Sequence, residues 1–483
     1  MASKYSKIAD RLTPKAIKQL ETSERFKQPR MEQIRKIEDI YLGKKKLALI
    51  TRSNVNFDSV ILRGFIDTAL SKVDENLSLH FGEVKPKDLL GSKKLNALYQ
   101  YESGLDRGKW SHIELGGKKL ALISGINIKK AYAESSPRFA FQFRNTDHYD
   151  FHMEPQGGNN LDKHLYKGEA NIFRTKAEIK KAALSEYYDS AQVAKLVSKI
   201  KEKDYKRNTD FYRNKVSRFQ ALGLDIETNE FLGTELFNMV EWVMYAEGEW
   251  WYLVFNYETG LWVKIDKLED CFSVAKQFPG RGPWSMWQTH IDPFLSWTPG
   301  FGDDIYPIAY TMYKLVNLMI DNLERQNYNQ VAYDPKVFTD PKQLLSRKDG
   351  LVRATLQTGQ SINNHLYRFE LPNTAGITVD LMQYFNSFLG EQTGLTRGAK
   401  GVAETDKVGI AYANLEQVAD RIGLTNKMYL QSQIETGNAF RYGCIDHLPA
   451  NYAIQILGAE GRAIDTEVER EELLGEYKIT VSG

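Results

Sequence analysis

Residues 306–331 read YPIAYTMYKLVNLMIDNLERQNYNQV and decide the organisation of the C-terminal half of the chain. Large apolar side chains recur there at helical spacing on one face: Ile308, Met312, Leu315, Val316, Met319 and Leu323. The pattern predicts a helix of about 24 residues and about 36 Å. The segment before it, WTPGFGDDIYP, is rich in residues that break regular structure. We therefore expect a long helix with a defined start.

A small mixed module and a second helix follow. The module has two Asp-Pro turns, a hairpin signal at Asp349-Gly350, and alternating residues that predict strands at 351–356 and 366–371. The next segment, ITVDLMQYFNSFLGEQTG, predicts a helix with one aligned apolar face: Val379, Met382, Phe385 and Leu389.

A polar loop separates that helix from a third one. The loop is GLTRGAKGVAETDKVG, residues 394–409, and its backbone groups would lack partners if it were buried. It is not a phosphate-binding loop, because the G-x-x-x-x-G-K spacing and the following Ser or Thr are missing. Beyond it, apolar or small residues at heptad spacing predict a helix of more than about thirty residues. Gly423 and Gly437 are its expected bend points.

The N-terminal part mixes helices and strands. RMEQIRKIEDIYLGKKK predicts an amphipathic helix that ends at Gly43, and PRFAFQFRN alternates as a half-exposed strand does. The lysines of KAEIKKAALSEYYDSAQVAKLVSKIKEKD form the solvated face of a helical stretch. MVEWVMYAEGEWWYLVFNYETGLWVKI predicts a β-meander with turns at Glu247-Gly248 and Thr259-Gly260. The fold class is therefore α+β.

The composition excludes several classes of protein. The 64 Lys and Arg residues nearly balance the 62 Asp and Glu residues, so any contact with nucleic acid must be local. Cys271 and Cys444, the only cysteines, supply neither a disulfide framework nor a thiolate zinc site. The apolar runs are shorter than the ~18 residues that span a bilayer, and MASKYSKIADRLTPK has no apolar signal core. We expect a modular soluble protein without a membrane partner.

Two acidic motifs raise the question of a metal. LGLDIETNEF places Asp225 and Glu227 on one side of a strand, as in the first motif of metal-dependent 3′–5′ exonucleases. On a strand, DHYDFH would place His148, Asp150 and His152 on one face, where they could hold a metal. Such residues more often form a solvated strand edge, and the sequence favours no nucleophile–base arrangement. We expect no catalytic residue, no metal and no cofactor.

The order of helix, mixed module, helix, polar loop and long helix resembles the portal protein family of tailed bacteriophages. RMEQIRKIEDIYLGKK is similar to the helix that opens the family's wing, and FRNTDHYDFHMEP to a wing strand that ends at a turn, here Glu154-Pro155. HIDPFLSWTPGFGDDIYPIAYTMYKLVNLMIDNLERQNYNQV looks like the run from the wing into the stem, and SFLGEQTGLTRGAKG like the approach to the tunnel loop. The resemblance covers most of the chain.

The resemblance implies a portal-like division of the chain. The expected parts are a wing at 1–304, a first stem helix at 305–330, a clip at 331–376, a second stem helix at 377–393, a tunnel loop at 394–408, a long bent wing helix at 409–446 and a C-terminal wing segment at 447–483. Members usually continue past a strand such as EYKITVSG. We therefore expect a crown that is short, absent or outside this chain.

The implied function is that of a portal, a non-enzymatic ring at one capsid vertex. The ring is usually dodecameric and gives double-stranded DNA a channel for packaging and ejection. The implied partners are other copies of the chain, the DNA, the large terminase ATPase, head–tail adaptor and tail proteins, and the major capsid protein. The implied location is the virion, with the host cytoplasm during assembly. The alternatives are a ring adaptor of a tail or secretion machine and the exonuclease that would use Asp225 and Glu227.

The resemblance also implies two functional surfaces. The tunnel loop would line the DNA channel and contact phosphates weakly, because its basic side chains exceed Glu404 and Asp406 by about one charge per subunit. The residues assigned to it are Gly394, Arg397, Gly398, Lys400, Gly401 and Lys407. The clip would present a basic docking rim. Its residues are Lys336, Lys342, Arg347, Lys348, Arg353 and Arg368.

Overall fold

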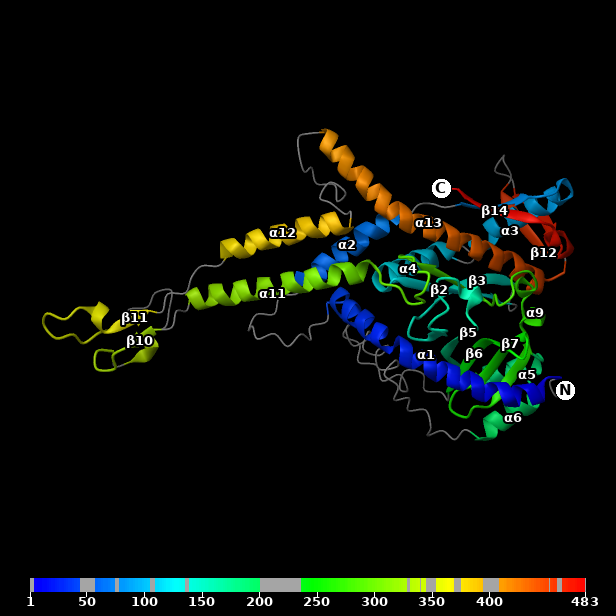
Figure 1. Ribbon diagram of the computed structural model, residues 1–483, viewed down its shortest axis with the longest axis horizontal. Helices are drawn as coiled ribbons and strands as arrows, with labels where there is room; N and C mark the ends of the chain where they lie inside the picture. Colours follow the sequence, from blue (N-terminus) through cyan, green and yellow to red (C-terminus); the bar gives the residue numbers. More distant parts are fainter. Residues whose placement is uncertain are drawn as a thin grey trace.

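The computed structural model describes residues 4–43, 57–73, 78–104, 109–134, 139–199, 236–327, 331–338, 340–344, 353–368, 375–393, 408–450, 452–457 and 463–482. Figure 1 shows a body that contains both ends of the chain and an arm that projects from it to a small tip. Helices and strands mix along the chain, and every described strand pair is antiparallel. This confirms the α+β class.

The elements have the following bounds. The longer helices are α1 (Ser6–Tyr41), α2 (Phe57–Val73), α3 (Leu89–Ser103), α4 (Trp110–Ser124), α5 (Lys176–Leu184), α6 (Ser190–Lys199), α11 (Phe301–Asn327), α12 (Ala375–Thr393) and α13 (Val408–His447). The short ones are η1 (Pro86–Asp88), η2 (Leu161–Lys163), α9 (Leu268–Cys271), α10 (Val274–Gln277), η3 (Pro341–Leu344), η4 (Ile362–Asn364) and η5 (Glu471–Leu474). The strands are β1 (Ser78–Glu83), β2 (Ile126–Glu134), β3 (Ala140–Thr146), β4 (Phe151–Met153), β5 (Tyr166–Thr175), β6 (Leu236–Ala246), β7 (Glu249–Asn256), β8 (Trp262–Lys267), β9 (Trp284–Gln288), β10 (Val331–Tyr333), β11 (Leu366–Arg368), β12 (Tyr452–Leu457), β13 (Ala463–Val468) and β14 (Tyr477–Ser482).

The largest sheet has the order β4-β5-β6-β7-β8 and contains the predicted meander. The β6–β7 hairpin turns at Glu247 and Gly248, which have φ angles of 56° and 85°. Two successive positive φ angles are typical of the tight turn whose twist matches a hairpin. The β7–β8 connection turns at Gly260, with φ 64°. Both predicted turns are confirmed.

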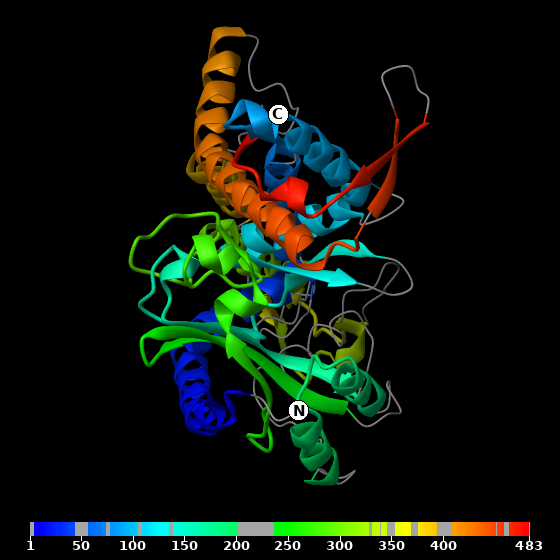
Figure 2. The same ribbon diagram turned by 90° about the vertical axis from the view of Figure 1, so that its right-hand side faces the viewer.

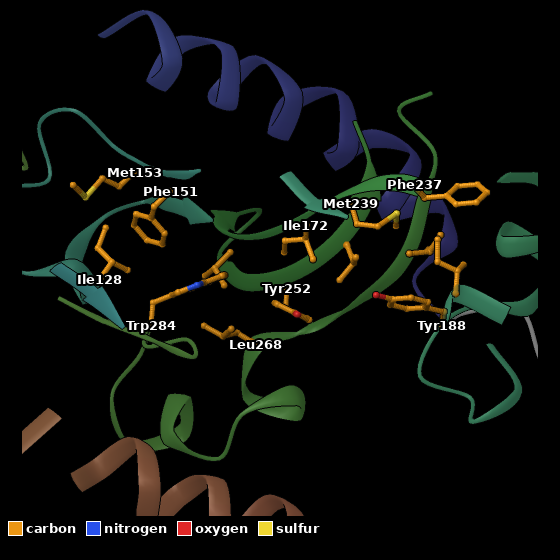
Figure 3. Close-up of a cluster of buried hydrophobic side chains, with 14 of the residues drawn as sticks. Ile128, Phe151, Met153, Ile172, Tyr188, Phe237, Met239, Tyr252, Leu268 and Trp284 are labelled. Carbon is orange, nitrogen blue, oxygen red and sulfur yellow. The ribbon is translucent and has the colours of Figure 1, made fainter. Parts of the chain in front are cut away.

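This sheet is buried on both faces, and its alternating side chains serve two cores. On one face, Leu12 and Ala16 of α1 pack in a cluster with Trp242 of β6. On the other face, Met239 and Val243 belong to a second cluster, part of which Figure 3 displays. The period of two along β6 therefore sends neighbouring residues into different cores. The predicted N-terminal helix is real and longer than its motif, because α1 also includes the residues before it.

The second cluster is closed by a three-stranded sheet with the order β3-β2-β9. In Figure 3, Ile128 of β2 and Trp284 of β9 approach Phe151 and Met153 of β4. The strand predicted from PRFAFQFRN is β3, which pairs along β2 from Glu134–Ala140 to Ile128–Thr146. The two sheets thus enclose one apolar layer.

The long helix α13 connects the parts of the body. Figure 2 shows that it is bent along its length. An ideal Cβ at Gly437 would lie 2.9 Å from Leu79 Cδ2, and one at Gly443 only 2.1 Å from Phe141 Cε2, whereas one at Gly423 would meet nothing within 4 Å. Two of these glycines therefore let α13 approach neighbouring side chains closely. The predicted long helix is confirmed.

One predicted element is wrong. A strand was expected at 351–356, but residues 353–356 form no strand, and residues 351–352 lie outside the described part of the chain. The strand at Leu366–Arg368 pairs with Val331–Tyr333 instead. Strands of three residues show no clear alternation, so the sequence does not reveal such a pairing. Within the described ranges, no helix has the length and apolar character needed to cross a membrane.

Candidate functional site

The arm is the part of the molecule that stands apart from the body. It consists of α11, which has 27 residues and a length of about 40 Å, and of α12, which returns beside it (Figure 1). At the body, α2 packs on α11 as well, and Ile305, Ala309, Met312 and Leu389 join one apolar cluster there. The arm is therefore anchored at one end.

The apolar face of α11 is wider than the chain itself can bury. The buried positions include Ile305, Ala309, Met312 and Val316, of which Ile305 and Ala309 lie outside the predicted stripe. Of that predicted stripe, Met312 and Val316 are buried, Ile308, Leu315 and Met319 are half-buried, and Leu323 is exposed. The sequence pattern thus combined residues that face the chain's own core with residues that do not.

Helix α12 has two apolar stripes, each with the spacing i, i+4, i+7, i+11. The inner stripe is wholly or partly buried and consists of the polar Thr378 and the apolar Met382, Phe385 and Leu389, whereas Val379 of the predicted face is 44% exposed. The outer stripe is exposed and consists of Ile377, Leu381, Tyr384 and Phe388. Ile377 is 65% exposed and Tyr384 64% exposed. Residues at this spacing share one side of a helix, so α12 presents a second helix-packing surface to solvent.

The tip contains the clip residues that the structure describes. Asp334 Oδ2 lies 3.1 Å from His365 Nδ1, and the Asp334 N–H donates to the His365 carbonyl at 3.0 Å, which ties β10 to β11. The basic residues Lys336, Lys342 and Arg353 are exposed. Arg368 lies in β11 opposite Val331. Arg347 and Lys348 lie outside the described residues, and the docking rim stays a prediction.

The tunnel-loop residues all lie outside the described part of the chain. These are Gly394, Arg397, Gly398, Lys400, Gly401 and Lys407. Asp225 and Glu227, the exonuclease candidates, lie outside it too. An exonuclease site would need further carboxylates from downstream, and two of those available belong to long helices: Asp321 to α11 and Asp446 to α13, where Asp446 Oδ2 accepts a hydrogen bond from the Ser273 N–H at 3.0 Å.

The DHYDFH motif does not form the strand edge expected of it. Residues 147–150 form a turn, β4 begins at Phe151, and His148, Asp150 and His152 are all buried. Asp150 Oδ1 accepts a hydrogen bond from Asn171 Nδ2 at 2.6 Å. In the ranges that the structure describes, no group of three or more His, Cys, Asp and Glu side chains could hold a metal ion. The residues of the motif are instead part of the buried interior of the body, next to α1.

Sequence reasoning missed a cavity of about 760 Å³ between the two sheets and the C-terminal end of α13. A buried network forms one wall: Lys130 Nζ lies 2.6 Å from Glu241 Oε2 and 3.4 Å from Glu169 Oε2, and Arg144 Nη2 lies 2.7 Å from Glu169 Oε2. Burial alone would raise the pKa of Glu241, but Lys130 and the Tyr252 hydroxyl lower it below its usual value. These contacts join residues that are distant in the sequence, so no local motif predicts them.

A second buried cation fixes α1 to the body. Lys27 Nζ donates to the carbonyl oxygens of His148, Tyr149 and Phe151 at 3.2, 2.8 and 2.7 Å. Burial lowers the pKa of Lys27 to about 7, against the opposing effect of neighbouring carboxylates such as Asp150. The turn that holds DHYDFH is therefore tied to α1 by the side-chain nitrogen of one lysine.

This burial predicts a pH dependence of stability. In the unfolded chain the lysine titrates near 10.5, so between pH 7 and 10.5 the unfolded state binds more protons and the free energy of unfolding rises with pH. Lys27→Met should reduce that slope by up to about 1.4 kcal/mol per pH unit in denaturant titrations. Lys167, whose pKa burial also lowers to about 7, should keep its own contribution. Lys18→Met, an exposed control on α1, should leave the slope unchanged; equal slopes in all three proteins would contradict the prediction.

Comparison with models of protein families and with curated proteins finds no match to this chain.

Proposed function

We propose that this chain is a portal subunit, which assembles into a ring at one capsid vertex and gives double-stranded DNA a channel. The observation that carries the proposal is the outer stripe of α12, residues 377, 381, 384 and 388, on an arm that projects from the body. A regular apolar stripe exposed on a helix calls for a partner helix. A second copy of the same chain supplies one.

A ring fits this surface better than a two-fold dimer does. The outer stripe lies beside the inner stripe, so a helix packed on it extends the arm sideways into a wall of helices. When each subunit meets the next through different faces, the contact repeats, and it closes where the rotation allows. A closed wall of arms surrounds a central passage. The sequence resemblance to portal proteins also supports a ring. It implies that the partners of the ring are DNA, the terminase, the adaptor and the capsid protein.

Electron microscopy of the purified protein tests the ring directly. We expect closed rings with a central opening in negative stain, and one large species in analytical ultracentrifugation. The exposed apolar area of the arm drives this assembly, so it should persist at high salt, where contacts between exposed charges are screened. A protein that stays monomeric at every concentration would refute the proposal.

Two further measurements separate the portal from its alternatives. Co-expressed with the major capsid protein, a portal should be incorporated at one vertex of the empty shell, whereas an adaptor of a tail or secretion machine should not enter shells at all. Pure protein should also show no magnesium-dependent hydrolysis of DNA. Turnover that Asp225→Ala abolishes would instead support the exonuclease.

A further inference from the structure

The segment between β9 and α11 presents three apolar side chains on a fixed turn. The exposed fractions are 47% for Ile291, 79% for Phe294 and 49% for Leu295. Asp292 Oδ1 accepts hydrogen bonds from the backbone N–H groups of Phe294 at 2.7 Å and Leu295 at 3.0 Å. The side chain of Asp292 thus holds the backbone in one conformation. We call residues 291–295 the apolar loop.

Hydrogen bonds and a close backbone contact attach the apolar loop to the body. Ser296 Oγ donates to the Glu154 carbonyl oxygen at 2.9 Å, and Gln288 Nε2 donates to the Ser296 carbonyl oxygen at 2.9 Å. Gly158 has φ 71°, and an ideal Cβ there would stand 2.4 Å from the Pro293 carbonyl oxygen. A loop that is ordered before it binds loses little conformational entropy on binding. The exposed Phe294 is therefore suited to insertion into a partner.

The cavity between the two sheets has the character that such a loop requires. Its volume is about 760 Å³, and its lining combines charged side chains with aromatic ones. The aromatic residues are Tyr132, Phe141, Phe173, Tyr187, Tyr188, Tyr252, Phe272 and Tyr442. Tyr187 is 46% exposed. Because Lys130 and Arg144 pair with the buried carboxylates of the wall, an apolar occupant would leave none of these charges without a counter-charge.

The apolar loop and the cavity lie at opposite ends of β9. Gly282 and Pro283, just before β9, line the cavity, whereas the apolar loop follows the other end of that strand. A subunit that meets its neighbours through unlike faces needs a projecting feature on one side and a recess on the other. One chain carries both.

We propose that the apolar loop of one subunit inserts Phe294 and Leu295 into the aromatic cavity of the next copy of this chain. The inference rests on the proposed ring and adds a second contact to it, at the level of the body and away from the arms. It also gives the ring a direction, because each subunit donates a loop on one side and receives one on the other.

The first test compares two exposed phenylalanines. Phe294→Asp should raise the protein concentration at which half the subunits are in rings by at least about tenfold, because a carboxylate would have to enter an aromatic recess. Phe26→Asp is the matched control, since Phe26 is 61% exposed on α1, and it should assemble as the wild type does. Rings of Phe294→Asp that form at the wild-type concentration would overturn the inference and leave the ring standing. A wild type without rings would overturn the proposed function itself.

The second test locates the receiving surface. Under mild oxidation, the double variant Phe294→Cys/Tyr187→Cys should give covalent dimers and higher multiples on a denaturing gel. All variants carry Cys271→Ser, because Cys271 adjoins the cavity residue Phe272 and would offer position 294 a second thiol. The two single variants in that background are the controls and should not give this ladder. An intact ring of the double variant that yields no linked subunits would overturn the assignment of the cavity as the receiving site.

Discussion

Ile377→Asp/Tyr384→Asp should abolish ring assembly while leaving the subunit folded. Both side chains are about two-thirds exposed in the single chain, so the substitutions remove almost no packing from it. In a ring, each interface would instead bury two carboxylates without partners. We expect a loss of at least about 3 kcal/mol per interface, or about a hundredfold in its dissociation constant. Sedimentation and negative stain measure the assembly, and thermal melting of the separated subunit reports its fold.

Gln383→Asp is the control for this pair. Residue 383 is exposed on α12 and lies about 130° around the helix from the middle of the outer stripe, as the 100° advance per residue dictates. It should add one negative charge to the same arm and keep the rings. If the double variant assembles normally, the outer stripe is not the subunit contact, and the proposed function loses the observation that carries it.

Shortening the loop between Thr396 and Asp406 should separate assembly from DNA passage. This polar, glycine-rich loop contributes little apolar burial, so rings should form and enter capsids as before. Packaged DNA should fall to a small fraction of the wild-type amount, because the loop would no longer contact the duplex in the channel. Particles are counted by electron microscopy, and their genome content is measured after nuclease treatment.

Charge reversal gives an independent version of the same test. Arg397→Glu/Lys400→Glu should repel the phosphates and lower DNA packaging or retention, and the effect should weaken with salt, because exposed charges are screened over about 10 Å at 0.1 M. Val402→Ala lies in the same loop and changes no charge, so it should package normally. The assignment of this loop to the DNA channel would be wrong if both kinds of particle, those with the shortened loop and those with the reversed charges, held normal amounts of full-length genome.

The sequence predicted the elements whose side chains repeat regularly. The helices α1, α11, α12 and α13 and the meander β6–β8 all follow from periods of 3.6 or 2 over many residues. What the sequence left open is which of two adjacent apolar stripes a helix turns inward. The outer stripe of α12 has a visible signal, the spacing of residues 377, 381, 384 and 388, but only the structure reveals that it is exposed.

Contacts between distant residues could not be predicted in this way. Lys130 lies 111 positions from Glu241, and Lys27 lies 124 from Phe151, so neither pair forms a local motif. The cavity could not be predicted either, because residues of two sheets and a helix form its walls. The apolar loop offered only a weak signal, an Asp-Pro turn followed by Phe294 and Leu295, because single exposed apolar residues are common on protein surfaces.

The pairing of β1 with β14 has a consequence for how the chain is made. Ser78 lies opposite Ser482, so β1 cannot pair until residues 477–482 have left the ribosome. The core that contains Leu79, Phe81 and Phe440 cannot close before then. Contacts across such a sequence separation form slowly, and intermediates without them expose apolar surface. Nascent chains, and chains that end before β14, would thus lack the β1–β14 pair and expose the core beneath it. We expect chaperones to assist the folding of such chains.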